Sequence, residues 1–185
     1  MRKITIALAM SLLLASAAAS AKDMRGRFGL GYDQSLGGAS GLALTYWVTH
    51  ALGIDLIMGL DLVSPDEGDN QVAFNTAFGV RYNIARARDV NLGIGLRGSM
   101  GFLNKAATGG DSIFQFNLDI PLIVEYFFSK HFAISLATGI TMQIVPEDGN
   151  ALTAQNTLLG TTRDTFSVSF FNGGFFGTAG FRFYF

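Results

Sequence analysis

Residues 52–62 read LGIDLIMGLDL, and every second position in this stretch holds a large apolar side chain. These positions are Leu52, Ile54, Leu56, Met58, Leu60 and Leu62. A period of two is that of a β-strand with one apolar face, whereas a helix would repeat its apolar positions every three or four residues. The stretch therefore predicts a strand rather than a helix.

The same alternation recurs along the chain and predicts eight strands, at 25–33, 40–48, 51–63, 71–84, 89–102, 113–128, 131–145 and 165–185. Their connections alternate between long (33–39, 64–70, 103–112, 146–164) and short (near 49–50, 85–88, 129–130). This pattern predicts an all-β fold, an eight-stranded antiparallel transmembrane β-barrel with short periplasmic turns and longer extracellular loops. Pro121 lies inside a predicted strand, so we expect a bulge there. Aromatic residues near the strand ends, Trp47 among them, predict girdles at the two membrane interfaces.

A soluble β-sandwich or lipocalin-like barrel would also alternate, and the composition of the two faces separates these alternatives. Only 15% of the 185 residues are charged, against roughly 25% in an ordinary soluble domain. The smaller face carries Gly, Ala, Ser, Asn and a few charges, which suits a narrow lumen better than a water-facing exterior. The composition therefore favours the membrane barrel.

The N-terminus has the three parts of a secretory signal peptide. Arg2 and Lys3 are basic, residues 4–14 are apolar, and Ala19 and Ala21 form a small-x-small cleavage site. The apolar part is shorter than the roughly 20 residues that a membrane anchor needs. We expect residues 1–21 to be a cleaved signal peptide and 22–185 to be the barrel domain.

Composition also excludes several classes of site. The chain has no cysteine, so it forms no disulfide and no thiolate metal site. Its net charge of −1 gives no reason to expect a nucleic-acid partner. We expect no cofactor and no metal.

The chain ends Gly180-Phe-Arg-Phe-Tyr-Phe185, with phenylalanine at every second position. This end resembles the C-terminal assembly signal of bacterial outer-membrane proteins, with Phe181, Phe183 and Phe185 in the matching positions. Together with the strand pattern, the chain resembles the small porin-like barrels of the OmpX and OmpA-barrel kind. The resemblance implies a Gram-negative outer-membrane location, recognition by the barrel-assembly machinery, contact with outer-membrane lipid and lipopolysaccharide, and a monomer.

Charged residues fall on the predicted inward face, where burial requires them to pair. Eight strands enclose just enough space for side chains to fill. We expect Asp55 to lie diagonal to Arg81 and Asp119 diagonal to Arg97. A further cluster of Arg25, Arg27 and Arg182 is expected near the periplasmic end, within reach of Glu125. The predicted lumen network comprises Arg25, Arg27, Asp55, Asp61, Arg81, Arg97, Asp119, Glu125 and Arg182.

Three functions are compatible with such a barrel. The first is a non-enzymatic protein of the cell envelope that acts through structure or through its loops, and it is the one we expect. The second is a narrow channel, or an OmpW-like passage for small or apolar molecules. The third, a lipid-modifying enzyme, fits poorly, because neither His50 nor His131 is part of a His-x-Ser motif and no Ser/His/Asp set is evident.

The predicted extracellular loops are acidic, Asp33 included. Asp66, Glu67 and Asp69 form the candidate loop-binding segment, for divalent cations that bridge lipopolysaccharide phosphates. The segment lacks the full spacing of an EF-hand loop, and a solvated acidic loop is the alternative.

Overall fold

The computed structural model describes residues 22–64, 70–104, 111–145, 151–152, 165–170 and 177–185. Within these ranges, no helical segment has the length and apolar character that a membrane crossing needs. The strands are β1 (Phe28–Gln34), β2 (Ser40–Trp47), β3 (Leu52–Val63), β4 (Gln71–Arg86), β5 (Val90–Leu103), β6 (Ile113–Phe127), β7 (Phe132–Val145), β8 (Thr165–Phe170) and β9 (Thr178–Tyr184).

The strands form a closed antiparallel ring. Each strand from β1 to β7 pairs with the next one along the chain, and β9 closes the ring by pairing with both β7 and β1. Closure removes open edges where the ring is complete, which a lipid environment requires of a spanning sheet. The fold is the predicted eight-stranded antiparallel β-barrel.

The eighth strand of the barrel consists of two segments, where the sequence predicted one continuous strand. β8 and β9 both pair antiparallel with β7, β8 with its end portion and β9 with its beginning. Ile140 faces Phe170 and Leu136 faces Ala179, so the register with β7 changes by five residues between the two segments. The sequence carries a signal for this change, because the outward phenylalanines fall on even positions in β8 (Phe166, Phe170) and on odd positions in β9 (Phe181, Phe183).

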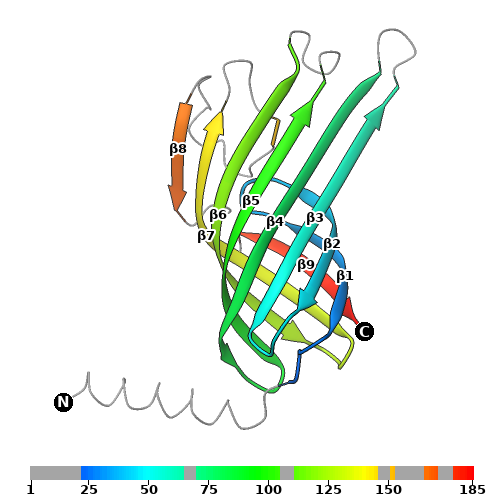
Figure 1. The fold of residues 1–185 in the computed structure, drawn as a ribbon, viewed down its shortest axis with the longest axis vertical. Coiled ribbons are helices and arrows are strands. Elements are labelled where there is room, and N and C mark those ends of the chain that lie inside the picture. The colour runs from blue at the N-terminus through cyan, green and yellow to red at the C-terminus, as the bar shows by residue number, and fades with distance from the viewer. Residues whose placement is uncertain (1–21, 65–69, 105–110, 146–150, 153–164, 171–176) are drawn as a thin grey trace, which may run out of the picture.

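The strands differ in height (Figure 1). β3 to β6 rise to the end of the barrel that carries the long connections, called here the long-loop end, whereas β1, β2 and β9 occupy the lower half, near the short-turn end. β2 pairs with β3 only as far as Leu42–Met58, although β3 continues to Val63. No described strand pairs with this last part of β3 on the β2 side.

Large apolar side chains cover the outside of the barrel. Along β6, exposed and buried residues alternate almost without exception, and the exposed set includes Phe114, Phe116, Leu122, Val124 and Tyr126. The same outward apolar row continues on the other strands. So large an exposed apolar surface matches lipid rather than water.

Two local expectations were wrong. The register between β5 and β6 is the same on both sides of Pro121, so no bulge lies there. Gly95 faces the proline instead, and a Cβ on Gly95 would lie 3.1 Å from the ring Cγ, so the missing side chain makes room for it. Trp47 is fully buried inside the barrel rather than placed in an interfacial girdle, because the Tyr46 position of β2 faces outward.

Candidate functional site

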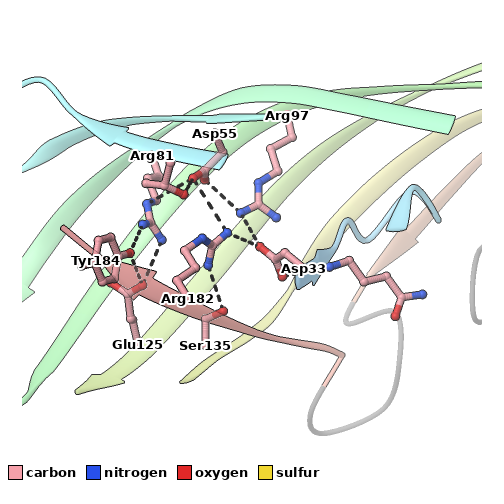
Figure 2. A network of polar contacts seen from close by, with 10 residues as sticks. Asp33, Asp55, Arg81, Arg97, Glu125, Ser135, Arg182 and Tyr184 are labelled. Atoms are coloured by element: carbon pink, nitrogen blue, oxygen red, sulfur yellow. Dashed lines mark hydrogen bonds and ion pairs between the residues drawn. The ribbon is translucent and has the colours of Figure 1, made fainter. Parts of the chain in front are cut away.

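The middle of the barrel interior holds a network of ion pairs. Six strands each contribute one charged side chain from an inward position at this level: Asp33 (β1), Asp55 (β3), Arg81 (β4), Arg97 (β5), Glu125 (β6) and Arg182 (β9). All six side chains are almost completely buried. Figure 2 shows the three guanidinium groups converging between carboxylates that come from different strands.

Asp33 and Asp55 lie between two of the arginines. The Nη2 atom of Arg97 is 3.3 Å from Asp33 Oδ2 and 3.0 Å from Asp55 Oδ2. Arg182 forms an ion pair with Asp33, and its Nη2 atom is 3.9 Å from Asp55. Each carboxylate therefore contacts more than one arginine, so the group behaves as a network rather than as separate pairs.

Arg81 joins this cluster to the short-turn end. Its Nε atom is 3.5 Å from Asp55 Oδ1, and its Nη1 atom is 3.5 Å from Glu125 Oε1. Tyr184 connects the same two partners, because its hydroxyl accepts from Arg81 Nη2 at 2.8 Å and donates to Glu125 Oε1 at 2.7 Å. The guanidinium also lies over the ring of Trp47 at 4.4 Å, which is cation–π geometry.

The network is electrically balanced, with three arginines against three carboxylates. Burying a charge is costly unless it is paired, so removing any one member leaves an uncompensated charge in the interior. Neutral groups complete the contacts, since Thr45 donates to Asp55 at 2.6 Å and Arg182 Nη1 donates to Ser135 at 3.2 Å. This arrangement fills the lumen at mid-height.

Glycines provide the space for these long side chains. A Cβ on Gly79 would lie 2.5 Å from Arg97 Cγ, and one on Gly180 would lie 2.5 Å from Asp33 Oδ1. No real Cβ contact is that short, so both glycines are required by packing.

A second layer, above the ion pairs, is formed by the turn between β1 and β2. Residues 35–39 fold into the lumen, where Ser35, Leu36 and Ala39 are buried. The sequence predicted an extracellular loop here, and that prediction was wrong. Two inward side chains of β6 hold the turn: the Gly37 amide donates to Asp119 Oδ2 at 2.9 Å, and Asn117 Nδ2 donates to Gly37 O at 2.6 Å.

A third β6 side chain holds residues 151–152 inside the barrel. Gln115 Oε1 accepts hydrogen bonds from the amides of Ala151 and Leu152 at 2.9 and 3.0 Å. The Leu152 side chain packs in an apolar cluster with Ala39, Ala43, Ile57 and Ala77. Gln115, Asn117 and Asp119 thus form a polar row on β6 that anchors two segments within the lumen.

The short-turn end is closed by a compact apolar cluster. Met24, Trp47, Phe127, Ala133 and Tyr184 are all buried there. The Nζ atom of Lys22 lies 4.2 Å from the centroid of the Phe127 ring and covers the cluster from outside.

Three residues assigned to the lumen network lie outside it. Arg25 is exposed, and Arg27 is part-exposed and donates to Lys130 O at 2.6 Å. The reason is that β1 begins only at Phe28, and the chain before it turns across the barrel mouth with Met24 pointing inward. Asp61 is exposed because β3 extends beyond its pairing with β2 at that height.

The structure places the other six predicted residues in the interior, with some changes of partner. Arg81 is diagonal to Asp55, as the strand register requires. Asp119 lies directly opposite Arg97 rather than diagonal to it, and its partner is the Gly37 amide. Arg182 contacts Asp33 and Asp55 rather than Glu125.

Sequence reasoning missed Asp33 and Tyr184 as members of the network. Asp33 was assigned to a loop, although Tyr32 before it and Leu30 are outward-facing, so the alternation already places it inward. Tyr184 shares the inward face with Arg182, and this spacing of two is the signal that could have identified it.

The C-terminal phenylalanines all face outward. Phe181, Phe183 and Phe185 are exposed on the barrel surface, and the rings of Phe181 and Phe183 contact Phe132 of β7. Their spacing therefore reflects one lipid-facing row along the closing strand.

The remaining candidate groups lie at the barrel ends. His50 Nδ1 is 2.6 Å from Asp23 Oδ1, and the Arg25 amide that donates to the same oxygen lowers the pKa of Asp23. Asp66, Glu67 and Asp69 lie outside the described residues, as do Ala19 and Ala21. Within the described part of the chain, no three His, Cys, Asp or Glu side chains are grouped as metal ligands would be.

A closed ring of eight antiparallel strands, an apolar outer surface and a paired polar interior define a small β-barrel of the outer-membrane type. No family model and no curated protein matches the sequence. In structure, the chain is similar to Ail, the attachment invasion locus protein of Yersinia pestis, with a TM-score of 0.40. The two share 14% sequence identity over 88% of this chain and 100% of that one.

Proposed function

We propose that the protein is a non-enzymatic, monomeric component of the bacterial outer membrane that stabilises the envelope or contacts partners through its extracellular loops. The observation that carries the proposal is the balanced ion-pair network across the middle of the lumen. Eight strands leave no water-filled channel once such side chains occupy the interior. The rigid barrel then serves as a support for its loops, which is where such scaffolds usually carry function.

The proposal includes export and assembly. Residues 1–21 direct export, and the outward row of Phe181, Phe183 and Phe185 is recognised by the barrel-assembly machinery. The outward apolar surface contacts lipid, and the long-loop end faces the lipopolysaccharide layer. Both chain ends of the mature protein then lie in the periplasm, as an even number of strands requires.

Two measurements on the purified protein test the proposal. A folded barrel should migrate faster on a detergent gel before boiling than after it. In planar bilayers the same preparation should show no stable large single-channel current. A stable large current from a heat-modifiable preparation would contradict the closed-lumen proposal and favour the channel.

We also propose that Asp66, Glu67 and Asp69 bind divalent cations at the lipopolysaccharide surface. Carboxylates clustered on an outer loop can share such cations with lipid phosphates. The supporting observation is their sequence clustering, Asp66-Glu67-Gly68-Asp69.

A further inference from the structure

The β1–β2 turn has an unusual position for a connection at the long-loop end. It lies inside the barrel, above the ion pairs, with Gly37 fitted tightly against the wall: a Cβ there would lie 2.3 Å from Ser99 Oγ and 2.9 Å from Asp119 Oδ1. A turn in this place closes the upper lumen from within. Its contacts show how firmly it is held.

Three hydrogen bonds of the turn are internal. Ser35 N donates to Ala39 O at 2.7 Å, Gly38 N to Ser35 O at 3.2 Å, and Ala39 N to Ser35 Oγ at 2.9 Å. Gly37 bonds to the β6 wall through Asn117 and Asp119, and the Ser35 side chain also hydrogen-bonds Asp119. The turn can therefore leave the wall as a unit once the few hydrogen bonds from Gly37 and Ser35 to Asn117 and Asp119 are replaced, while the Ser40 amide stays bonded to Asn75 of β4.

The part of the barrel wall that the turn covers carries polar side chains, which can form hydrogen bonds with water. Ser99, Asn117, Asp119 and Thr141 are polar and buried beneath or beside it. The Ser99 hydroxyl has no hydrogen-bond partner among the described residues. Buried polar groups are normally satisfied, and water that enters when the turn leaves would supply this hydroxyl with a partner.

Asp119 has a second partner within reach when the turn leaves. It lies directly opposite Arg97 on the neighbouring strand, where side chains are close enough to interact. Arg97 Nε has no hydrogen-bond partner among the described residues. Asp119 can thus exchange the Gly37 amide for Arg97, which keeps its charge compensated.

The unpaired edge of β3 next to β2 offers the turn a second position. The first residues of β2 still lie beside Gly59, where a Cβ would be 2.2 Å from Ser40 O, but no described strand pairs with Leu60–Val63 on that side. The same register, continued outward, brings Gly38 opposite Leu62. Residues 37–39, which precede β2, can extend it along this edge, and unpaired strand edges favour such pairing.

We propose that the β1–β2 turn is a two-position gate. In the position observed, it closes the upper lumen from inside. In the second, residues 37–39 extend β2 along β3, and the space that the turn leaves, beside residues 151–152 on Gln115, becomes a polar vestibule open to water and small hydrophilic solutes from the extracellular side. The ion-pair network below stays in place, so the vestibule is closed at its base and the proposal is independent of through-conductance.

The absence of cysteine makes the gate measurable by single-cysteine labelling. The labelling rate of Leu36→Cys measures how accessible the turn is to solvent. In the otherwise unchanged protein, this cysteine should react slowly with a charged maleimide. Adding Asn117→Ala and Asp119→Ala removes both side-chain anchors and should raise its labelling rate at least tenfold. Ser64→Cys, which is exposed, should label fast in both backgrounds, and Ala133→Cys, buried at the short-turn end, slowly in both.

A disulfide tests the second position itself. Gly38→Cys with Leu62→Cys should close under mild oxidation in the unanchored background and much more slowly with the anchors intact. Leu42→Cys with Met58→Cys pairs in the observed register and should close in both. Heat-modifiability confirms folding of each variant, and Asn117→Ala alone replaces the double substitution if that one does not fold.

Equal slow labelling of Leu36→Cys in folded anchored and unanchored barrels would overturn the gate. Fast labelling with the anchors intact would overturn the closed resting position. Labelling without closure of the 38–62 disulfide would overturn the extended position along β3.

Discussion

Arg97 shows how a single residue determines the interior. Its guanidinium contacts Asp33 and Asp55 from two different strands, and its backbone position faces Asp119 on a third. Because the group is buried, the arginine stabilises the barrel only as long as these partners remain in place. The same holds for Arg81 and Arg182, so each of the three is a point at which the interior can be tested.

Replacing Arg97 with methionine should lower the free energy of unfolding by about 3–5 kcal/mol, since two buried carboxylates lose a partner. Urea titration of the barrel in detergent, followed by tryptophan fluorescence, measures this. Arg88→Met is the matched control, because the Arg88 side chain is 83% exposed and its loss should cost less than about 1 kcal/mol. Equal effects of the two substitutions would show that the network contributes little to stability.

Among the elements, β9 combines three roles. It closes the ring between β1 and β7, it carries Arg182 and Tyr184 into the network, and it presents Phe181, Phe183 and Phe185 to lipid. The alternation of inward and outward residues separates these roles on its two faces. Changes on the outer face should therefore affect assembly more than the interior.

Deleting Phe185 should slow assembly of the barrel in cells several-fold, while the purified protein should still refold in detergent. The reason is that Phe185 is 72% exposed and adds little packing to the folded barrel. Pulse labelling with the heat-modifiability gel measures the assembly rate, and Phe128→Ala, 62% exposed on a turn at the same end, is the matched control. Equal assembly rates for the two variants would argue against a special role for the C-terminal residue.

At the scale of the whole molecule, the described charges divide by position. The interior holds three arginines against four carboxylates, Asp119 included, and the short-turn end carries exposed Lys130 and Arg88 and part-exposed Arg86 with Asp23 and Asp89. The sequence places Asp66, Glu67 and Asp69 in a connection at the opposite end. The barrel thus separates an acidic loop from a basic rim.

Calcium should raise the melting temperature of the barrel in lipopolysaccharide-containing detergent by a few degrees if the acidic loop binds it. The neutral variant Asp66→Asn, Glu67→Gln, Asp69→Asn should lose this response, because the carboxylates are the ligands. Asp23→Asn at the short-turn end is the control and should keep it. A calcium response that persists in the triple variant would assign the ion to another part of the molecule.

Alternation in the sequence determined the class of fold, because strands have a period of two and the apolar face must meet lipid. It also placed Asp55, Arg81 and Arg182 inward, since the alternation along each strand alone determines which face a residue occupies. It did not determine the residues of the interior that depend on where strands begin and end: Arg25, Arg27 and Asp61 were assigned inward although they lie beyond the complete ring.

Only the tertiary structure decided which inward groups meet. The short β1–β2 hairpin brings Asp33 to Arg97 and Arg182, and it places its turn on Asn117 and Asp119 some eighty residues away in the chain. The physical reason is that a period of two specifies whether a side chain faces inward or outward, but not its height along the barrel axis. Heights are set by strand lengths, by the turns that end them and by the space that glycines such as Gly37 and Gly180 leave open.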